Sequence, residues 1–187
     1  PKIDLKIEDA IGRMWQCSTI QLDFNLPERF KLEYVAADGS RQRPIMIHRA
    51  IFGSLERFFG IMTENYAGDF PFWLAPEQVR LLPVTDEVMS YAEQTREQLQ
   101  QAGVRCSIDR SGDRLGKLIR TGEQQKIPLL AVIGAQEAEH RTLSLRSRLQ
   151  GDLGAVELDA LLKAAISANS QRAATLDLPA ATPAAAP

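Results

Sequence analysis

The chain has 187 residues, of which 44% are hydrophobic and 25% charged, and its formal net charge is −2. This composition suits one or two folded domains, whereas the slight acidity excludes a protein that coats nucleic acid through its overall charge. Cys17 and Cys106 form no CxxC pair, so a disulfide framework is not indicated and a reducing cytoplasm is expected. The longest apolar run, residues 127–135, is far shorter than the roughly 20 residues that cross a bilayer, so no membrane association is expected.

The first third of the chain has the alternation typical of β-strands. Polar and apolar residues alternate over residues 3–7, and residues 17–24 are rich in β-branched and aromatic side chains. The stretches 30–35 and 43–51 flank Asp38-Gly39, a strong turn signal, and are predicted to pair as a hairpin. We therefore expect an antiparallel sheet. Because strand-like residues follow Pro1 at once, we also expect the chain to be part of a longer protein.

After Gly53 the hydrophobic period becomes helical. One apolar stripe is formed by Leu55, Phe58, Phe59 and Met62, and the helix is expected to end near residues 67–68. Two prolines within residues 69–76 then indicate a boundary between modules. We predict one domain over residues 1–70, a linker over 71–76 and a second domain over 77–170.

The second domain alternates short apolar strands with amphipathic helices. Strands are predicted over residues 79–84, 104–108, 128–133 and 142–146, and helices over residues 86–102, 114–125 and 156–166. The stripe predicted for the last helix is Leu158, Leu161, Leu162, Ala165 and Ile166. This order predicts an α/β domain with helices packed on a mostly parallel sheet. Residues 171–187 (QRAATLDLPAATPAAAP) are not expected to pack a core, and are predicted to be a disordered tail.

The only locally basic stretch lies in this second domain. Residues 103–150 contain nine Lys and Arg residues against five Asp and Glu residues. Charge alone leaves two interpretations open: ordinary solvated faces of a helix and two strands, or a local RNA-binding patch.

The stretch 48–57 joins the end of a strand to the start of a helix. Gly53 permits positive φ or a close approach, Ser54 is a good N-cap, and the first N–H groups of the helix attract anions. Arg57 is unexpected there, because a cation opposes the helix dipole. It is either a surface arginine paired with Glu56 or a side chain that stacks on an aromatic base and reaches phosphate oxygens.

Residues 48–60 (HRAIFGSLERFFG) closely resemble motif 3 of class II aminoacyl-tRNA synthetases. The longer stretch 43–57 and the stretch 15–24 (WQCSTIQLDF) are similar to the threonyl branch of these enzymes. The resemblance extends from residue 1 to about residue 168. It implies the C-terminal part of an antiparallel-sheet catalytic domain, followed by a mixed-sheet α/β anticodon-binding domain.

The resemblance assigns roles to residues in the first domain. It implies that Arg57 stacks on the adenine of ATP, which is used as a substrate with Mg2+, and touches its phosphates. Gln16 and Thr19 would bind the adenylate, and Gln21 and Ser54 would bind the threonyl part.

His48 would be one of three ligands of a zinc ion, by the same resemblance. A single histidine on a strand is ordinarily structural, because a zinc site needs three or four ligands. In the threonyl family the other two ligands, a Cys and a His, come from upstream segments that this chain does not contain. The zinc would reject valine, which is nearly isosteric with threonine but has no hydroxyl to coordinate.

Three residues of the second domain fall where the threonyl family contacts anticodon bases: Arg120, Glu137 and Arg146. Such residues can read splayed bases by hydrogen bonds and by arginine stacking. Gly112 departs from the family pattern, which often has asparagine there, so the resemblance does not extend to one expected base contact.

The resemblance implies a threonine–tRNA ligase with threonine, ATP and tRNA(Thr) as substrates, acting as a homodimer at full length. Because motifs 1 and 2 are missing from this chain, the 187 residues alone are expected to be inactive. The alternative is a stand-alone RNA-binding protein that retains the anticodon module and a decayed synthetase remnant.

Overall fold

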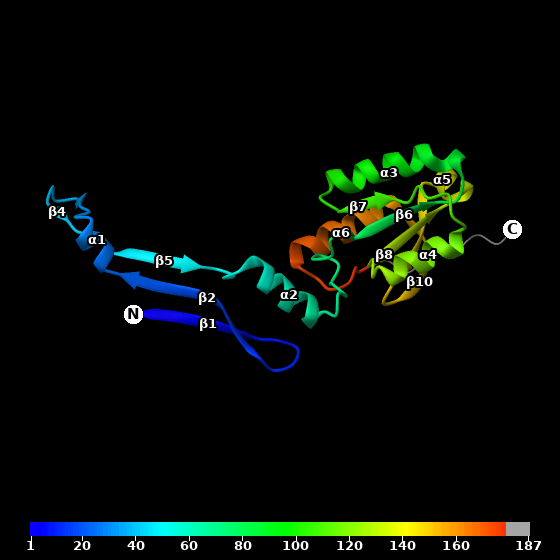
Figure 1. Ribbon diagram of the computed structural model, residues 1–187. Helices are drawn as coiled ribbons and strands as arrows, with labels where there is room; N and C mark the ends of the chain where they lie inside the picture. Colours follow the sequence, from blue (N-terminus) through cyan, green and yellow to red (C-terminus); the bar gives the residue numbers. More distant parts are fainter. Residues whose placement is uncertain (179–187) are drawn as a thin grey trace. The chain divides into compact units, whose positions relative to one another are not determined.

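The computed structural model describes residues 1–178 and divides the chain into two compact units, Pro1–Gly68 and Asp69–Pro187 (Figure 1). Among residues 1–178, no helix has the length and apolarity of a membrane span.

The first unit is built on a three-stranded antiparallel sheet. Its strands are β1 (Lys2–Glu8), β2 (Met14–Asp23) and β5 (Met46–Ala50), in the order β1-β2-β5. Directly opposed residues share a face of the sheet, so Thr19 lies on the same face as Asp4, and Gln21 on the same face as His48. One face is therefore mainly polar. The other face carries exposed apolar side chains, namely Ile3, Leu5, Leu22 and Ile47.

The segment between β2 and β5 differs from the sequence prediction. Helix α1 (Asn25–Arg29) was not expected, and it begins where the Asp23 carboxylate accepts the backbone N–H groups of Asn25 and Leu26. The hairpin around Gly39 is limited to β3 (Tyr34–Val35) and β4 (Arg41–Gln42). The prediction that stretch 43–51 pairs with stretch 30–35 is wrong, because β5 pairs with β2.

Helix α2 (Leu55–Asn65) follows β5 and is capped by Ser54. It ends before Ala67 and Gly68, both of which have positive φ. The stripe predicted from the sequence is largely exposed here, since Leu55 and Phe59 are 66% and 56% exposed. Ile61 is the buried residue of this helix.

The second unit is a five-stranded mixed sheet covered by helices on both faces (Figure 1). Its strands are β6 (Val79–Pro83), β7 (Cys106–Ile108), β8 (Leu129–Ile133), β9 (Thr142–Ser147) and β10 (Gly151–Glu157), in the order β10-β9-β8-β6-β7. Only the pairs β6-β7 and β6-β8 are parallel, so the sheet is less parallel than expected.

The two faces of this sheet pack against different helices. Side chains of α3 (Met89–Gln101), which follows the short helix η1 (Asp86–Val88), and of α6 (Leu158–Gln171) form the larger core. On the opposite face, α4 (Leu115–Gln124) places Leu118 against Leu82 and Leu130. The short helix α5 (Ala135–His140) follows β8 directly.

Several predictions for the end of the chain need correction. Helix α5 and strand β10 were not predicted, and α6 is longer than expected. Ala164 and Ala168 are buried in α6, whereas Ile166 of the predicted stripe is 49% exposed. The disordered tail was expected from residue 171, but Leu176 is buried in the core and the carbonyl of Ala174 accepts the N–H of Phe72. Residues 179–187 of that predicted tail lie outside the described residues.

Candidate functional site

The polar face of the β1-β2-β5 sheet brings three of the predicted site residues together. The Asp4 carboxylate accepts hydrogen bonds from Gln16 Nε2 and Thr19 Oγ1, each at 2.8 Å. Gln21 Nε2 in turn donates to Thr19 Oγ1 at 3.4 Å. Hydrogen bonds from Lys2 and Thr19 hold the pKa of Asp4 below its ordinary value, so the carboxylate stays ionised at neutral pH. The face is thus a connected row of donors and acceptors, centred on a carboxylate that the sequence did not single out.

His48 lies on the same face, directly opposite Gln21. Its Nε2 is 2.9 Å from Asp23 Oδ2, and its side chain is 45% exposed. Backbone N–H donation from Leu26 and the contact with His48 lower the pKa of Asp23. A metal-binding histidine usually donates its other ring N–H to a carboxylate, which orients the ring toward the metal. Within residues 1–178, however, no three His, Cys, Asp or Glu side chains converge as a metal site would require.

The turn between β5 and α2 is fixed against β2. Gly53 has φ 68°, and a Cβ atom there would lie 3.0 Å from the carbonyl oxygen of Cys17. Ser54 Oγ accepts the N–H of Arg57 at 3.3 Å and donates to Glu56 at 2.8 Å. The backbone N–H of Glu56 itself, and then the hydroxyl of Ser54, lower the pKa of the Glu56 carboxyl. The predicted N-cap is confirmed, and the first turn of α2 is held close to the strand that carries Gln16 and Thr19.

Arg57 leaves this first turn exposed to solvent and lies against an aromatic ring. Its Cζ is 5.1 Å from the centroid of the Trp15 ring, within the range of a cation–π contact. The sequence left open whether Arg57 pairs with Glu56. In the structure Glu56 accepts a hydrogen bond from Ser54, and Arg57 lies beside Trp15. In the sequence Trp15 stands out only as part of the stretch 15–24, and its neighbours along the chain do not indicate this contact.

The three predicted anticodon residues lie in two places on the second unit. Arg120 is exposed on α4. Arg146 sits opposite Leu130, on the face that α4 covers, and its guanidinium is 3.7 Å from Glu123 of α4. Glu137 lies in the first turn of α5, where its Oε2 accepts the N–H of Gly134 at 2.9 Å. The structure therefore brings Arg120 and Arg146 to one face and places Glu137 at the carboxyl end of β8.

Gly112 marks the loop in which the resemblance expected asparagine. Its φ is 70°, a left-handed conformation that glycine adopts freely and that asparagine tolerates better than most residues. The backbone is therefore compatible with either residue, but glycine offers no side chain to a base.

Two models of known protein families match the chain, one within each of the two units. Residues 1–66 match the family model of the class II tRNA synthetase core domain (G, H, P, S and T), and residues 78–168 match that of the anticodon binding domain. A class II core next to an anticodon-binding domain defines part of a class II aminoacyl-tRNA synthetase.

The curated relatives narrow the class. The chain is 83% identical over 178 residues to the threonine–tRNA ligase of Parasynechococcus marenigrum (strain WH8102), and 62% identical over 168 residues to that of Thermosynechococcus vestitus (strain NIES-2133 / IAM M-273 / BP-1). These matches cover 95% and 90% of the chain but only 29% and 28% of the relatives. The solved RNA binding domain of threonyl-tRNA synthetase from Cryptosporidium parvum Iowa II is 37% identical, with a TM-score of 0.79 over 89% of this chain and 42% of that one. The chain belongs to the threonyl-tRNA synthetase family.

Proposed function

We propose that the chain is part of a threonine–tRNA ligase, to which it contributes the motif 3 arginine and the anticodon-binding domain. The reaction joins threonine to the α-phosphate of ATP as an adenylate with release of pyrophosphate, and then transfers the threonyl group to the terminal ribose of tRNA(Thr) with release of AMP. The single observation that best supports this is the Arg57 guanidinium lying against the Trp15 ring at the first turn of α2, in a unit that matches the class II core.

The residues of this chain would act by positioning and by stabilising charge. A guanidinium can stack on adenine while its N–H groups reach phosphate oxygens, which lysine cannot do. We assign this role to Arg57 with ATP and Mg2+. Gln16 and Thr19 would hydrogen-bond the adenylate, and Gln21 and Ser54 the threonyl part. The hydrogen bonds to Asp4 orient Gln16 and Thr19 before a substrate arrives.

We further assign His48 as one ligand of a zinc ion. The Asp23 contact at Nε2 supports this, because it leaves Nδ1 as the ring nitrogen for the metal. Zinc would coordinate the amino group and hydroxyl of threonine, which valine cannot match. The remaining ligands would come from the rest of the full-length protein.

Zinc content gives a direct test of His48. A full-length chimera, in which this chain replaces the matching segment of the Parasynechococcus enzyme, should bind about one zinc per chain. His48→Ala should lose most of it, measured by elemental analysis of the dialysed protein. His140→Ala is the matched control, since His140 bonds Gln136 within α5 of the other unit. Equal zinc in the His48 variant and its parent would remove His48 from the ligand set.

For the second unit we assign Arg120, Glu137 and Arg146 to the anticodon of tRNA(Thr). The match to the anticodon-binding family supports this, together with the exposure of Arg120 and the weak ion pairs of Arg146. By family resemblance we infer a cytoplasmic homodimer for the full-length protein.

The same chimera tests the function as a whole. We expect threonine-dependent ATP–pyrophosphate exchange and charging of tRNA(Thr) within about threefold of the parent enzyme, because closely similar segments are being exchanged. Exchange without threonine, or with valine in its place, provides the control. A folded chimera that binds tRNA but catalyses no exchange would favour the RNA-binding alternative. The 187-residue chain alone should show no exchange.

A further inference from the structure

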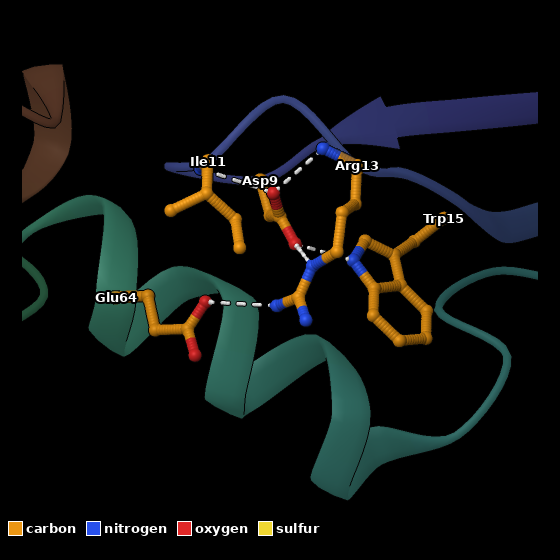
Figure 2. A network of polar contacts seen from close by, with 5 residues as sticks. All are labelled: Asp9, Ile11, Arg13, Trp15 and Glu64. Carbon is orange, nitrogen blue, oxygen red and sulfur yellow. Dashed lines mark hydrogen bonds and ion pairs between the residues drawn. The ribbon is translucent and has the colours of Figure 1, made fainter.

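The turn between β1 and β2 contains a buried carboxylate that no role above uses. The carboxylate of Asp9, a residue only 6% exposed, accepts the backbone N–H groups of Ile11 and Arg13 at 3.1 and 2.8 Å (Figure 2). It also accepts Arg13 Nε at 2.5 Å and Trp15 Nε1 at 2.8 Å. Four donors thus converge on one side chain, which fixes both the turn and the indole ring.

The network extends to α2 through Arg13. Arg13 Nη2 is 3.9 Å from Glu64 Oε2 near the end of this helix (Figure 2), and Arg13 Cζ is 5.3 Å from the Trp15 ring centroid. Arg57, at the start of the same helix, contacts the same ring. The indole is therefore held by Asp9 at its N–H and touched by one arginine from its own hairpin and one from α2.

The charge of Asp9 is stable in this setting. Burial of the carboxylate acts to raise its pKa, but hydrogen bonds from Trp15, Arg13 and Ile11 outweigh burial and keep the pKa well below the ordinary value. The acceptor that holds Trp15 therefore stays ionised throughout the neutral range.

An exposed arginine samples many rotamers, and ordering it when a ligand binds has an entropic cost. An aromatic ring fixed beside the guanidinium restricts those rotamers before the ligand arrives. Here the Trp15 ring is itself fixed by the buried Asp9 carboxylate. The β1-β2 turn therefore restricts the rotamers of Arg57 in the first turn of α2.

We propose that Trp15 is a positioning residue for ATP: fixed by Asp9, its ring holds the Arg57 guanidinium where adenine stacks on it. This proposal rests on the proposed function, because it assumes that Arg57 binds ATP. Trp15 itself acts through Arg57.

The test uses the full-length chimera and Trp15→Leu, which removes the ring face and the indole N–H together. We expect the KM for ATP in threonine-dependent exchange to rise about three- to tenfold, the range of a lost cation–π contact. The kcat and the KM for threonine should change less than about twofold, because Trp15 would act only in ATP binding. Trp15→Phe keeps an aromatic face without the N–H, so its KM for ATP should lie between that of the parent chimera and that of Trp15→Leu.

Trp73→Leu is the matched control. Arg172 Cζ is 6.0 Å from the centroid of the Trp73 ring in the other unit, so this variant loses the same kind of contact in a unit to which no ATP-binding residue is assigned. Its KM for ATP should equal that of the parent chimera. If Trp15→Leu folds poorly, the KM for ATP of Trp15→Phe and of Asp9→Asn is compared with the parent chimera and with Trp73→Leu instead.

A double-mutant cycle with Arg57→Ala separates positioning from general support. If Trp15 acts through Arg57, then Trp15→Leu should change kcat/KM for ATP less than about twofold once Arg57 is alanine. Additive losses, or a fall in active enzyme at unchanged KM for ATP, would overturn the proposal. An active chimera impaired by Arg57→Ala but not by Trp15→Leu would refute the positioning role alone. An inactive chimera would refute the proposed function, and the positioning role with it.

Discussion

Arg57→Ala in the full-length chimera is expected to reduce kcat/KM for ATP in threonine-dependent exchange at least about a hundredfold, the scale of losing a charge-stabilising donor. The alanine removes both the stacking surface and the donors to phosphate oxygens. The measurement is pyrophosphate exchange at varied ATP, with threonine saturating.

Arg57→Lys sharpens this test, because it keeps the charge but loses the planar guanidinium. We expect it to recover less than about a tenth of the lost activity. Arg29→Ala is the control, since Arg29 is exposed on α1 of the same unit and has no assigned role. An effect of Arg57→Ala no larger than that of Arg29→Ala would remove Arg57 from the ATP site.

Arg146→Ala is expected to weaken binding of tRNA(Thr) about tenfold or more, the usual cost of losing a base contact. Its ion pairs at 3.7 Å to Glu123 and 3.9 Å to Asp152 are long enough to leave the guanidinium available to a base. The measurement is equilibrium binding of tRNA(Thr) and of a transcript with a changed anticodon.

Lys117→Ala provides the comparison for Arg146, because Lys117 is a more exposed cation on α4 that pairs with Asp113. Any loss there should be the same for both RNAs, as for a phosphate contact. If Arg146→Ala also weakens both RNAs equally, Arg146 contacts only the backbone and does not read a base.

How far the sequence predicted the fold depended on whether the signal was local. Alternation over residues 3–7 and the helical period after Gly53 correctly indicated β1 and α2. The pairing of stretch 43–51 was wrong because Asp38-Gly39 specifies only a nearby turn, whereas β5 finds its partner across the sheet in β2.

The missed elements have physical reasons of their own. Helix α5 has six residues, too few to display a helical period. In β10 the register shifts between Asp152 and Gly154, and this irregularity breaks the alternation that a strand would otherwise show.

The candidate site was foreseen as residue types but not as contacts. Gln16, Thr19 and Gln21 were assigned by resemblance, and they do lie in one hydrogen-bonded row. The carboxylates that organise this region, Asp4 and Asp9, were not foreseen. Their roles depend on strand register and on burial, neither of which a single sequence displays.

The contact of Gly53 with β2 has a consequence for the spacing of the site. The carbonyl of Cys17 lies so close that even one methyl group at position 53 would push the start of α2 away from the strand. Arg57 lies in the first turn of α2 and would move with the helix, while Trp15 would remain hydrogen-bonded to Asp9. The distance between the Arg57 guanidinium and the Trp15 indole thus depends on Gly53 having no side chain.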